Sequence, residues 1–236
     1  MACLPNGKTP PPGNCAQSWL GSRDNWDASH FLIYAGQPLY PILMSMKPFL
    51  QAGQIIDWHH PHITAQAQTL AEGCTDKRAI AEACFLFVRD EVRHSVDFQC
   101  GPVTCAASEV LRHRSGYCYA KSHLLAALLR ANGLPAALCY QRLRLDGPQT
   151  NFCLHGLNAV WLEEFGWLRL DARGNKPGVD ARFAPPKEHL AFALVHPGEA
   201  DLPGRYAEPL PLVIEALRTA ESWQSLLADL PDLPPS

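Results

Sequence analysis

The chain lacks a strong excess of charge of either sign. Its 236 residues include 20 Lys and Arg against 23 Asp and Glu, which gives a formal net charge of −3. A basic excess of the kind that binds nucleic acid is absent, so we expect no nucleic-acid partner. Hydrophobic residues make up 47% of the chain and charged residues 18%, values typical of a folded globular protein rather than a disordered one.

The sequence also lacks a long uninterrupted apolar run. Its most apolar early stretch, residues 31–50, is cut by Pro38, Pro41 and Pro48 and is too broken to span a membrane. The first thirty residues have no basic start followed by a short apolar run, as a secretory signal would have. We therefore expect no membrane association and a cytoplasmic location.

Cysteine is too scarce for a disulfide framework, and it is not arranged for a metal. The nine cysteines are an odd number and include no Cys-x-x-Cys pair, so we expect reduced thiols. His59, His60 and His62 follow Asp57, but Pro61 interrupts the run and adjacent histidines point apart on most backbones. The preferred interpretation is a surface turn capped by Asp57, and we expect neither a metal nor another cofactor.

Proline is scarce only in the middle of the chain. Seven of the 21 prolines lie in residues 1–50 and nine in residues 185–236. We predict an N-terminal extension rich in Pro and Gly at 1–50, a regular domain at 51–205, and a C-terminal helix with a tail at 206–236.

Apolar periodicity predicts the order of the regular elements. Three- and four-residue spacing predicts helices over residues 76–93, 104–112, 118–131 and 212–227. Runs typical of strands follow the third helix at residues 136–145, 154–162 and 167–171. Helices followed by an antiparallel sheet indicate an α+β fold.

The groups needed for acyl transfer from an amide lie on three of these elements. Cys118 follows a glycine turn and begins a helix predicted to be buried, where free amides and the helix dipole favour a thiolate. His155 lies on the second strand, and Asp171 ends the third. A thiolate, an imidazole and an orienting carboxylate form a catalytic set. Cys153, two residues before His155, is expected to pack beside the site.

Residues 107–171 resemble the transglutaminase-like superfamily of papain-type cysteine enzymes, in a bacterial-looking branch. The matching motifs are SEVL at 108–111, GYC at 116–118, AALLR at 126–130, NGLP at 132–135, HGLNAVW at 155–161 and WLRLD at 167–171. The resemblance implies a papain-like core whose nucleophile begins a buried helix packed on an antiparallel sheet, and it places the catalytic domain at 51–205. It implies Cys118 as nucleophile, His155 as general base and acid, and Asp171 as the residue that orients the imidazole.

The chain departs from the family at two places. Gly156 and Leu157 stand where many members have Ala and Trp after the histidine, and Ala172 stands where many have Pro. Neither change removes a functional group.

The resemblance also implies an oxyanion hole made by the nucleophile's own amide and an upstream donor. Gln99 is a candidate donor because its amide side chain suits that role. Tyr117 and Tyr119 are expected to line the cleft or pack beneath it. Arg173 lies in a predicted turn, from which it could reach a substrate carboxylate.

The face on which each catalytic side chain lies gives a geometric prediction. If residues 154–162 pair antiparallel with 167–171, a register with Leu162 opposite Trp167 places His155 and Asp171 on opposite faces. A catalytic pair requires a connection of three or five residues, such as 163–165 or 163–167, or a bulge.

These features predict a cysteine-dependent hydrolase or acyl transferase that acts on peptide, protein or side-chain amides through a thioester. We prefer hydrolysis, because nothing in the sequence resembles the extra sandwich domains of crosslinking enzymes. One alternative is a transglutaminase that joins a Gln side chain to an amine. Another is a binding module without catalysis, although such a module has no reason to keep Cys118, His155 and Asp171.

Overall fold

The computed structural model describes residues 33–34, 37–38, 45–145 and 151–234. The chain divides into two compact units, Met1–Pro41 and Ile42–Ser236. In the first unit the described residues form strands β1 (Ile33–Tyr34) and β2 (Gln37–Pro38), which pair antiparallel. Most of the extension predicted at residues 1–50 lies outside the described residues.

The second unit combines a layer of helices with an antiparallel sheet. Its helices are η1 (Lys47–Leu50), α2 (Pro61–Ala71), α3 (Lys77–Glu91), α4 (Ser95–Phe98), α5 (Ala107–His113), α6 (Cys118–Ala131), α7 (Pro211–Thr219) and α8 (Trp223–Ala228). Its strands are β3 (Arg93–His94), β4 (Ser115–Gly116), β5 (Ala136–Arg144), β6 (Phe152–Leu162), β7 (Gly166–Leu170), β8 (Arg182–Ala184), β9 (Lys187–His189) and β10 (Ala200–Asp201).

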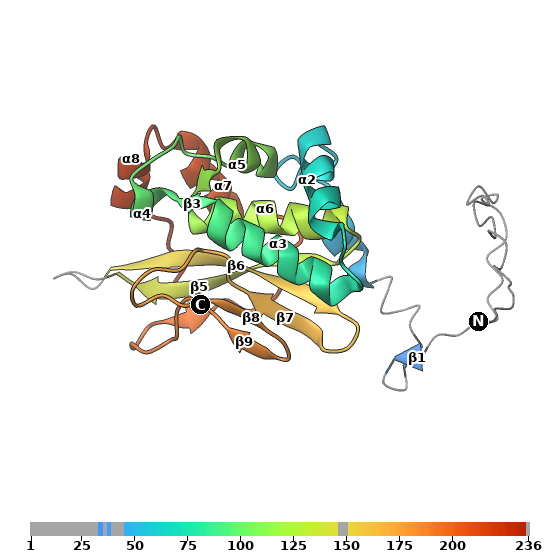
Figure 1. Ribbon diagram of the computed structural model, residues 1–236. Coiled ribbons are helices and arrows are strands. Elements are labelled where there is room, and N and C mark those ends of the chain that lie inside the picture. Colours follow the sequence, from blue (N-terminus) through green and yellow to red (C-terminus); the bar gives the residue numbers. More distant parts are fainter. Residues whose placement is uncertain (1–32, 35–36, 39–44, 146–150, 235–236) are drawn as a thin grey trace, which may run out of the picture. The chain divides into compact units, whose positions relative to one another are not determined.

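The main sheet has the strand order β10-β5-β6-β7, and its neighbouring strands are antiparallel. Figure 1 shows the layer of helices over one face of this sheet and the β8–β9 hairpin beside β7, from where β8 also contacts α3. The α+β class predicted from the order of the elements is confirmed. None of the helices within the described ranges is long and apolar enough to cross a membrane.

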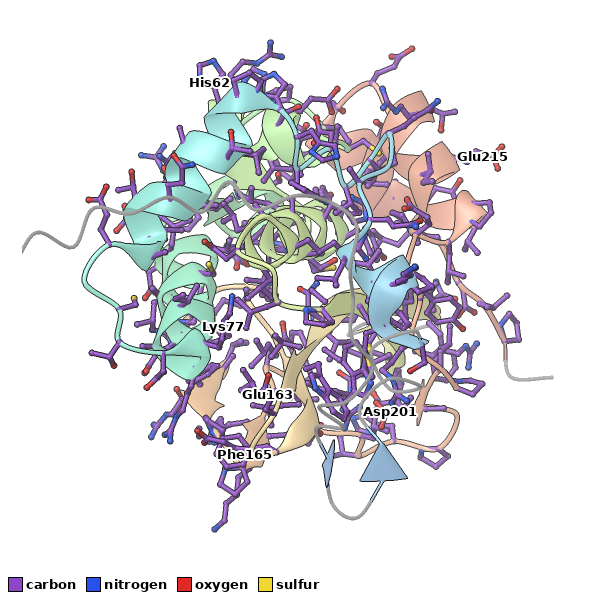
Figure 2. All side chains as sticks on the ribbon, turned by 90° about the vertical axis from the view of Figure 1, so that its right-hand side faces the viewer. His62, Lys77, Glu163, Phe165, Asp201 and Glu215 are labelled. Atoms are coloured by element: carbon purple, nitrogen blue, oxygen red, sulfur yellow. The ribbon has the colours of Figure 1, made fainter. Side chains whose placement is uncertain are left out.

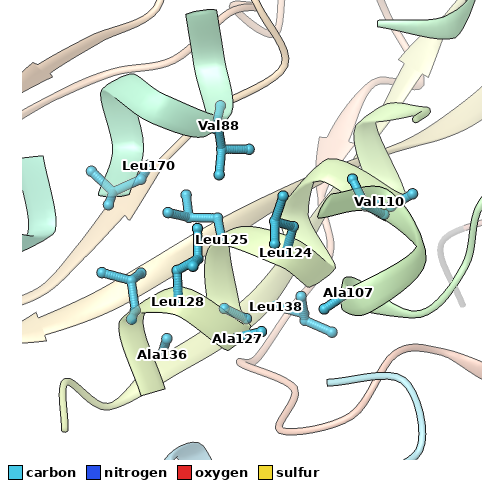
Figure 3. Close-up of a cluster of buried hydrophobic side chains, with 14 of the residues drawn as sticks. Val88, Ala107, Val110, Leu124, Leu125, Ala127, Leu128, Ala136, Leu138 and Leu170 are labelled. Carbon is cyan, nitrogen blue, oxygen red and sulfur yellow. The ribbon is translucent and has the colours of Figure 1, made fainter. Parts of the chain in front are cut away.

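Helix α6 forms the centre of the core. Every residue from Cys118 to Arg130 is buried, because this Ala- and Leu-rich helix has helices on one side and the sheet on the other. Figure 3 shows Leu124, Leu125 and Leu128 among side chains from α3, α5, β5 and β7. In Figure 2 α6 is seen nearly end-on, and the exposed Glu215 of α7 lies at the edge of the view.

The register of β6 and β7 confirms the geometric prediction. Leu162 pairs with Gly166 and Asn158 pairs with Leu170, so three residues, 163–165, connect the strands. Strand β7 begins one residue earlier than predicted. Continued to its end, this register places His155 and Asp171 on the same face of the sheet.

Helix α5 begins at Ala107, three residues later than predicted. The Glu109 carboxylate accepts hydrogen bonds from the amides of Cys105 (2.8 Å) and Ala106 (3.0 Å), which satisfies two donors just before the helix. Asp57 accepts a hydrogen bond from the Ser108 amide at 3.0 Å. Asp57 therefore caps α5, a helix distant in sequence, as well as lying in a turn.

The single C-terminal helix predicted over residues 212–227 is wrong. Ala220 has an extended backbone that ends α7, and the Ser222 hydroxyl accepts a hydrogen bond from the Ser225 amide to start α8. The break changes the helical face that packs inward. Leu226 is therefore buried, whereas Leu227 is 41% exposed.

Candidate active site

Cys118 is the first residue of α6, where the chain turns from β4 into the helix. Strand β4 pairs in parallel with β3, and this pairing fixes the position of the turn. At Gly116 a side chain would meet Thr104 and Ala120 at 3.0 Å, so glycine is needed for this close approach. The Cys118 thiol is 8% exposed and lines a cleft of about 520 Å³.

His155 lines the same cleft and forms a buried hydrogen-bonded pair with Asp171. The distance from His155 Nε2 to Asp171 Oδ2 is 2.8 Å, and the two residues are 4% and 1% exposed. Asp171 also accepts hydrogen bonds from the amides of Ala191 (3.0 Å) and Arg173 (3.2 Å). These donors fix both carboxylate oxygens and thereby orient the imidazole.

The protonation of this pair is set by opposing effects. Burial lowers the pKa of His155, but the Asp171 carboxylate and the Cys118 thiolate outweigh it and raise the pKa to about 10. Burial likewise opposes ionisation of Asp171, yet the charge and hydrogen bond of His155 hold the pKa of Asp171 below its ordinary value. The geometry therefore favours an imidazolium beside the Asp171 carboxylate at neutral pH.

Gly156 explains how the nucleophile reaches the histidine. A side chain at Gly156 would lie 3.0 Å from the Tyr119 Cα, so the start of α6 rests directly on the β6 backbone. The Gly156 amide lies 3.5 Å from the Cys118 sulfur. The sulfur therefore lies beside the strand backbone next to His155, and Cys118 is one of the groups that raise the pKa of His155.

The two tyrosines beside the nucleophile line the cleft and are anchored by their hydroxyls. Tyr117 donates a hydrogen bond to the Trp223 carbonyl at 2.5 Å, and Tyr119 donates to the Leu154 carbonyl. Cys153 also lies in the cleft wall, and burial raises its pKa to about 12. It is therefore a neutral packing residue at neutral pH.

Gln99 and Arg173 lie in surroundings other than those expected. Gln99 is exposed in a left-handed conformation at the end of α4 and is not among the residues that line the cleft. Arg173 does line the cleft, but its guanidinium binds both oxygens of Asp97, at 2.5 and 3.0 Å. It is thus already paired and not free for a substrate carboxylate.

Two neighbours of the site were not found from the sequence. Asp97 lies 76 residues before its partner Arg173, and Phe192 lies in an irregular segment with no periodic pattern. Both residues reach the site only through contacts between parts of the chain that are far apart in the sequence, and local patterns do not predict such contacts. His59, His60 and His62 are exposed near the start of α2, and the described residues contain no cluster of three potential metal ligands.

Part of the chain is similar in sequence to a known protein family. Residues 64–172 match the family model of the transglutaminase-like superfamily, and this range contains all three residues of the site. The resemblance indicated by the sequence motifs is confirmed by this match: residues 64–172 are similar to the transglutaminase-like superfamily.

Two solved structures are among those that share part of the fold. One is a candidate cysteine protease from Cytophaga hutchinsonii, with a TM-score of 0.44 and 18% identity, covering 55% of this chain and 42% of that one. The other is the periplasmic domain of TgpA from Pseudomonas aeruginosa, with a TM-score of 0.43 and 23% identity, covering 55% and 47%. The match thus spans less than half of either structure. No curated protein gives a significant match.

Proposed function

We propose that the protein is a cysteine-dependent hydrolase that cleaves a peptide or side-chain amide through a thioester on Cys118. The observation that supports this most is the hydrogen bond between Asp171 and His155, with the Cys118 sulfur beside the backbone of the next residue, Gly156, and both Cys118 and His155 lining the cleft. The raised pKa of His155 and the lowered pKa of Asp171 support the roles of an imidazolium proton donor and of a carboxylate that holds it.

In the first step the Cys118 thiolate attacks the carbonyl carbon of the amide. The His155 imidazolium gives its proton to the leaving amine as the C–N bond breaks, and a thioester remains. The free amide at the start of α6 favours the developing oxyanion, because the first amides of a helix have no intrahelical acceptor. Asp171 keeps the imidazole in place throughout.

In the second step His155, now neutral, removes a proton from water. The resulting hydroxide attacks the thioester carbonyl, the C–S bond breaks, and an acid and the Cys118 thiolate are released. Water is the acceptor that we propose, since a cleft of about 520 Å³ has room for it beside an acyl group. A primary amine in its place would give transfer instead.

Profiling with a peptide and side-chain amide library tests this proposal. The expected result is release of an amine or ammonia by the wild type and none by Cys118→Ala. Adding a primary amine separates the two acceptors: hydrolysis continues to give the acid, whereas a transglutaminase would give the substituted amide. Equal turnover by Cys118→Ala would refute a thioester route.

A further inference from the structure

We propose that the partly buried ion pair between Arg173 and Asp97 is a positioning device for the catalytic His155–Asp171 pair, and that Phe192 carries its effect to the imidazole. The inference rests on the proposed function. According to this proposal, Arg173, Asp97 and Phe192 affect the reaction rate although they do not touch the reacting atoms.

The first connection runs through the backbone of Arg173. This residue follows Asp171 by two positions, and its amide donates a hydrogen bond to Asp171 Oδ1 at 3.2 Å. The Arg173 side chain is only 8% exposed, so its position is fixed by its partners rather than by solvent. Moving the Arg173 side chain therefore also moves the Arg173 amide, which donates a hydrogen bond to the catalytic carboxylate.

The second connection anchors Arg173 to the helical layer. Asp97 in α4 binds the guanidinium with both oxygens, and Oδ1 also accepts a hydrogen bond from Lys176 at 2.6 Å. A two-point pairing of this kind fixes the orientation of the guanidinium as well as its distance. Asp97 thus holds both ends of the turn that follows Asp171, at residues 173 and 176.

The third connection reaches the imidazole itself. The Arg173 guanidinium lies 5.6 Å from the centre of the Phe192 ring. The Phe192 ring in turn meets the His155 ring edge to face, with centroids 5.0 Å apart and an interplanar angle of 89°. The residue before it, Ala191, donates its amide to Asp171. Arg173 and the segment at 191–192 therefore hold both members of the catalytic pair.

The surroundings of the ion pair are strongly charged and titratable. His94 Nδ1 lies 3.8 Å from Asp97, and Lys121 from α6 also acts electrostatically on this group of residues. Burial opposes ionisation of Asp97, but its cationic partners lower its pKa to about 2. Asp97 therefore remains an anchor over the whole range in which the site would work. If Arg173 is removed, Asp97 keeps only the more exposed Lys176 as a close cationic partner.

The test compares Arg173→Met with Arg169→Met. Arg169 is a matched control, because it lies two residues before Asp171 and pairs with the two carboxylates of Glu188 and Asp201. The first measurement needs no substrate: the rate of alkylation of Cys118 by iodoacetamide at pH 5, divided by the rate at pH 9. A high ratio means that the His155 imidazolium keeps Cys118 reactive in acid. Both rates are measured on the same protein, so the ratio does not depend on differences between preparations.

We expect Arg173→Met to lower this ratio about tenfold and kcat about 10- to 100-fold, with KM within about twofold, because a small displacement of a catalytic group is costly. The alkaline limb of the kcat/KM profile should move to lower pH as Asp171 loses its hold on His155. Arg173→Lys should restore part of the ratio, and Arg169→Met should leave it unchanged.

A folded Arg173→Met with a wild-type ratio and wild-type kcat would overturn the proposal. If Arg173→Met does not fold, Phe192→Leu serves instead: it keeps the ion pair, removes the edge contact and should lower the ratio several-fold, and no change would also overturn the proposal. Slow alkylation of the wild type at pH 5 would count against the proposed function itself, which separates that failure from this one.

Discussion

At the scale of single residues, burial makes most of the described thiols unreactive. Burial raises the pKa of Cys84 to about 12 and that of Cys139 to about 11. Seven cysteines lie within the described ranges, and all seven are free. Cys118 is set apart because it faces an imidazole that is itself held by a carboxylate.

The three residues of the site should respond differently to substitution. Cys118→Ala and His155→Ala should each reduce turnover to background while the fold is retained, because each acts only as part of a unit. Asp171→Ala should leave a small activity, since the imidazole loses its orientation but not its chemistry. Initial rates on a substrate from the library, with circular dichroism as the control for folding, measure this. Substantial turnover by His155→Ala would contradict the assigned roles.

A second residue-scale prediction concerns His123, a fully buried histidine on α6. Its Nδ1 pairs with the Cys105 carbonyl at 2.8 Å, and burial lowers its pKa from 6.5 to about 4. The unfolded chain binds the proton more readily, so stability conferred by neutral His123 is complete above pH 6.5 and is lost as the pH falls toward 4. The loss should be about 3 kcal/mol in the free energy of unfolding.

Urea unfolding of the wild type and of His123→Asn between pH 7 and 4 measures this contribution. Asn keeps a donor for the Cys105 carbonyl but does not titrate, so its stability should fall less steeply with acid. Parallel curves for the two proteins would show that His123 is not the group responsible.

At the scale of elements, local pattern was sufficient for the buried helix α6 and for the long strands of the main sheet. The helix from Cys118 was predicted because Leu124, Leu128 and their neighbours repeat with the period of a helix. The strands after it were predicted from their own apolar runs. The register of β6 and β7 followed from the two-residue period of a strand together with the need for His155 and Asp171 to meet.

Local pattern was insufficient where capping or long-range pairing decides. The break between α7 and α8 depends on Ser222, whose hydroxyl competes to start a new helix, and periodicity does not register this competition. Asp97 and Arg173 are brought together only by the fold. Gln99 was chosen as an oxyanion-hole donor because of its residue type alone, and residue type does not predict where a side chain lies in the fold.

Gly156 gives an element-scale prediction about the contact between β6 and α6. Gly156→Ala should push the start of α6 away by a few tenths of an ångström and cost about 1 to 3 kcal/mol in stability, with a loss of turnover. Gly156→Val should be more severe because its side chain is larger. Thermal unfolding and initial rates measure both effects. A Gly156→Val protein as active as the wild type would show that the close approach is not needed.

At the scale of the whole second unit, the C-terminal segment is part of the site. The Leu154 amide donates to the Pro231 carbonyl at 2.7 Å, and Arg142 binds Asp232 at 2.7 Å. Leu227 and Leu230 line the same cleft as the nucleophile. The segment therefore connects the edge of the sheet to the helix-side wall of the cleft.

Two deletions compare how much the C-terminal segment and the N-terminal part of the chain contribute to stability. Removing residues 221–236 should lower Tm by about 10 °C or more, since the buried Leu226 and the partners of Leu154 and Tyr117 are lost together. Removing residues 1–41 should change Tm by only a few degrees, because that part of the sequence has no periodic apolar pattern. Differential scanning calorimetry compares the two, and the reverse order of effects would contradict this organisation.

The central claim is that Cys118 is a nucleophile activated by His155, and its most direct test is site-resolved alkylation. Wild-type protein and His155→Ala are treated with limiting iodoacetamide at pH 5, and peptide mass spectrometry gives the rate at each cysteine. The account predicts that Cys118 reacts at least about tenfold faster than the other eight thiols in the wild type, and that this advantage disappears in His155→Ala. A Cys118 that reacts no faster than the other thiols, or one equally fast without His155, would contradict it.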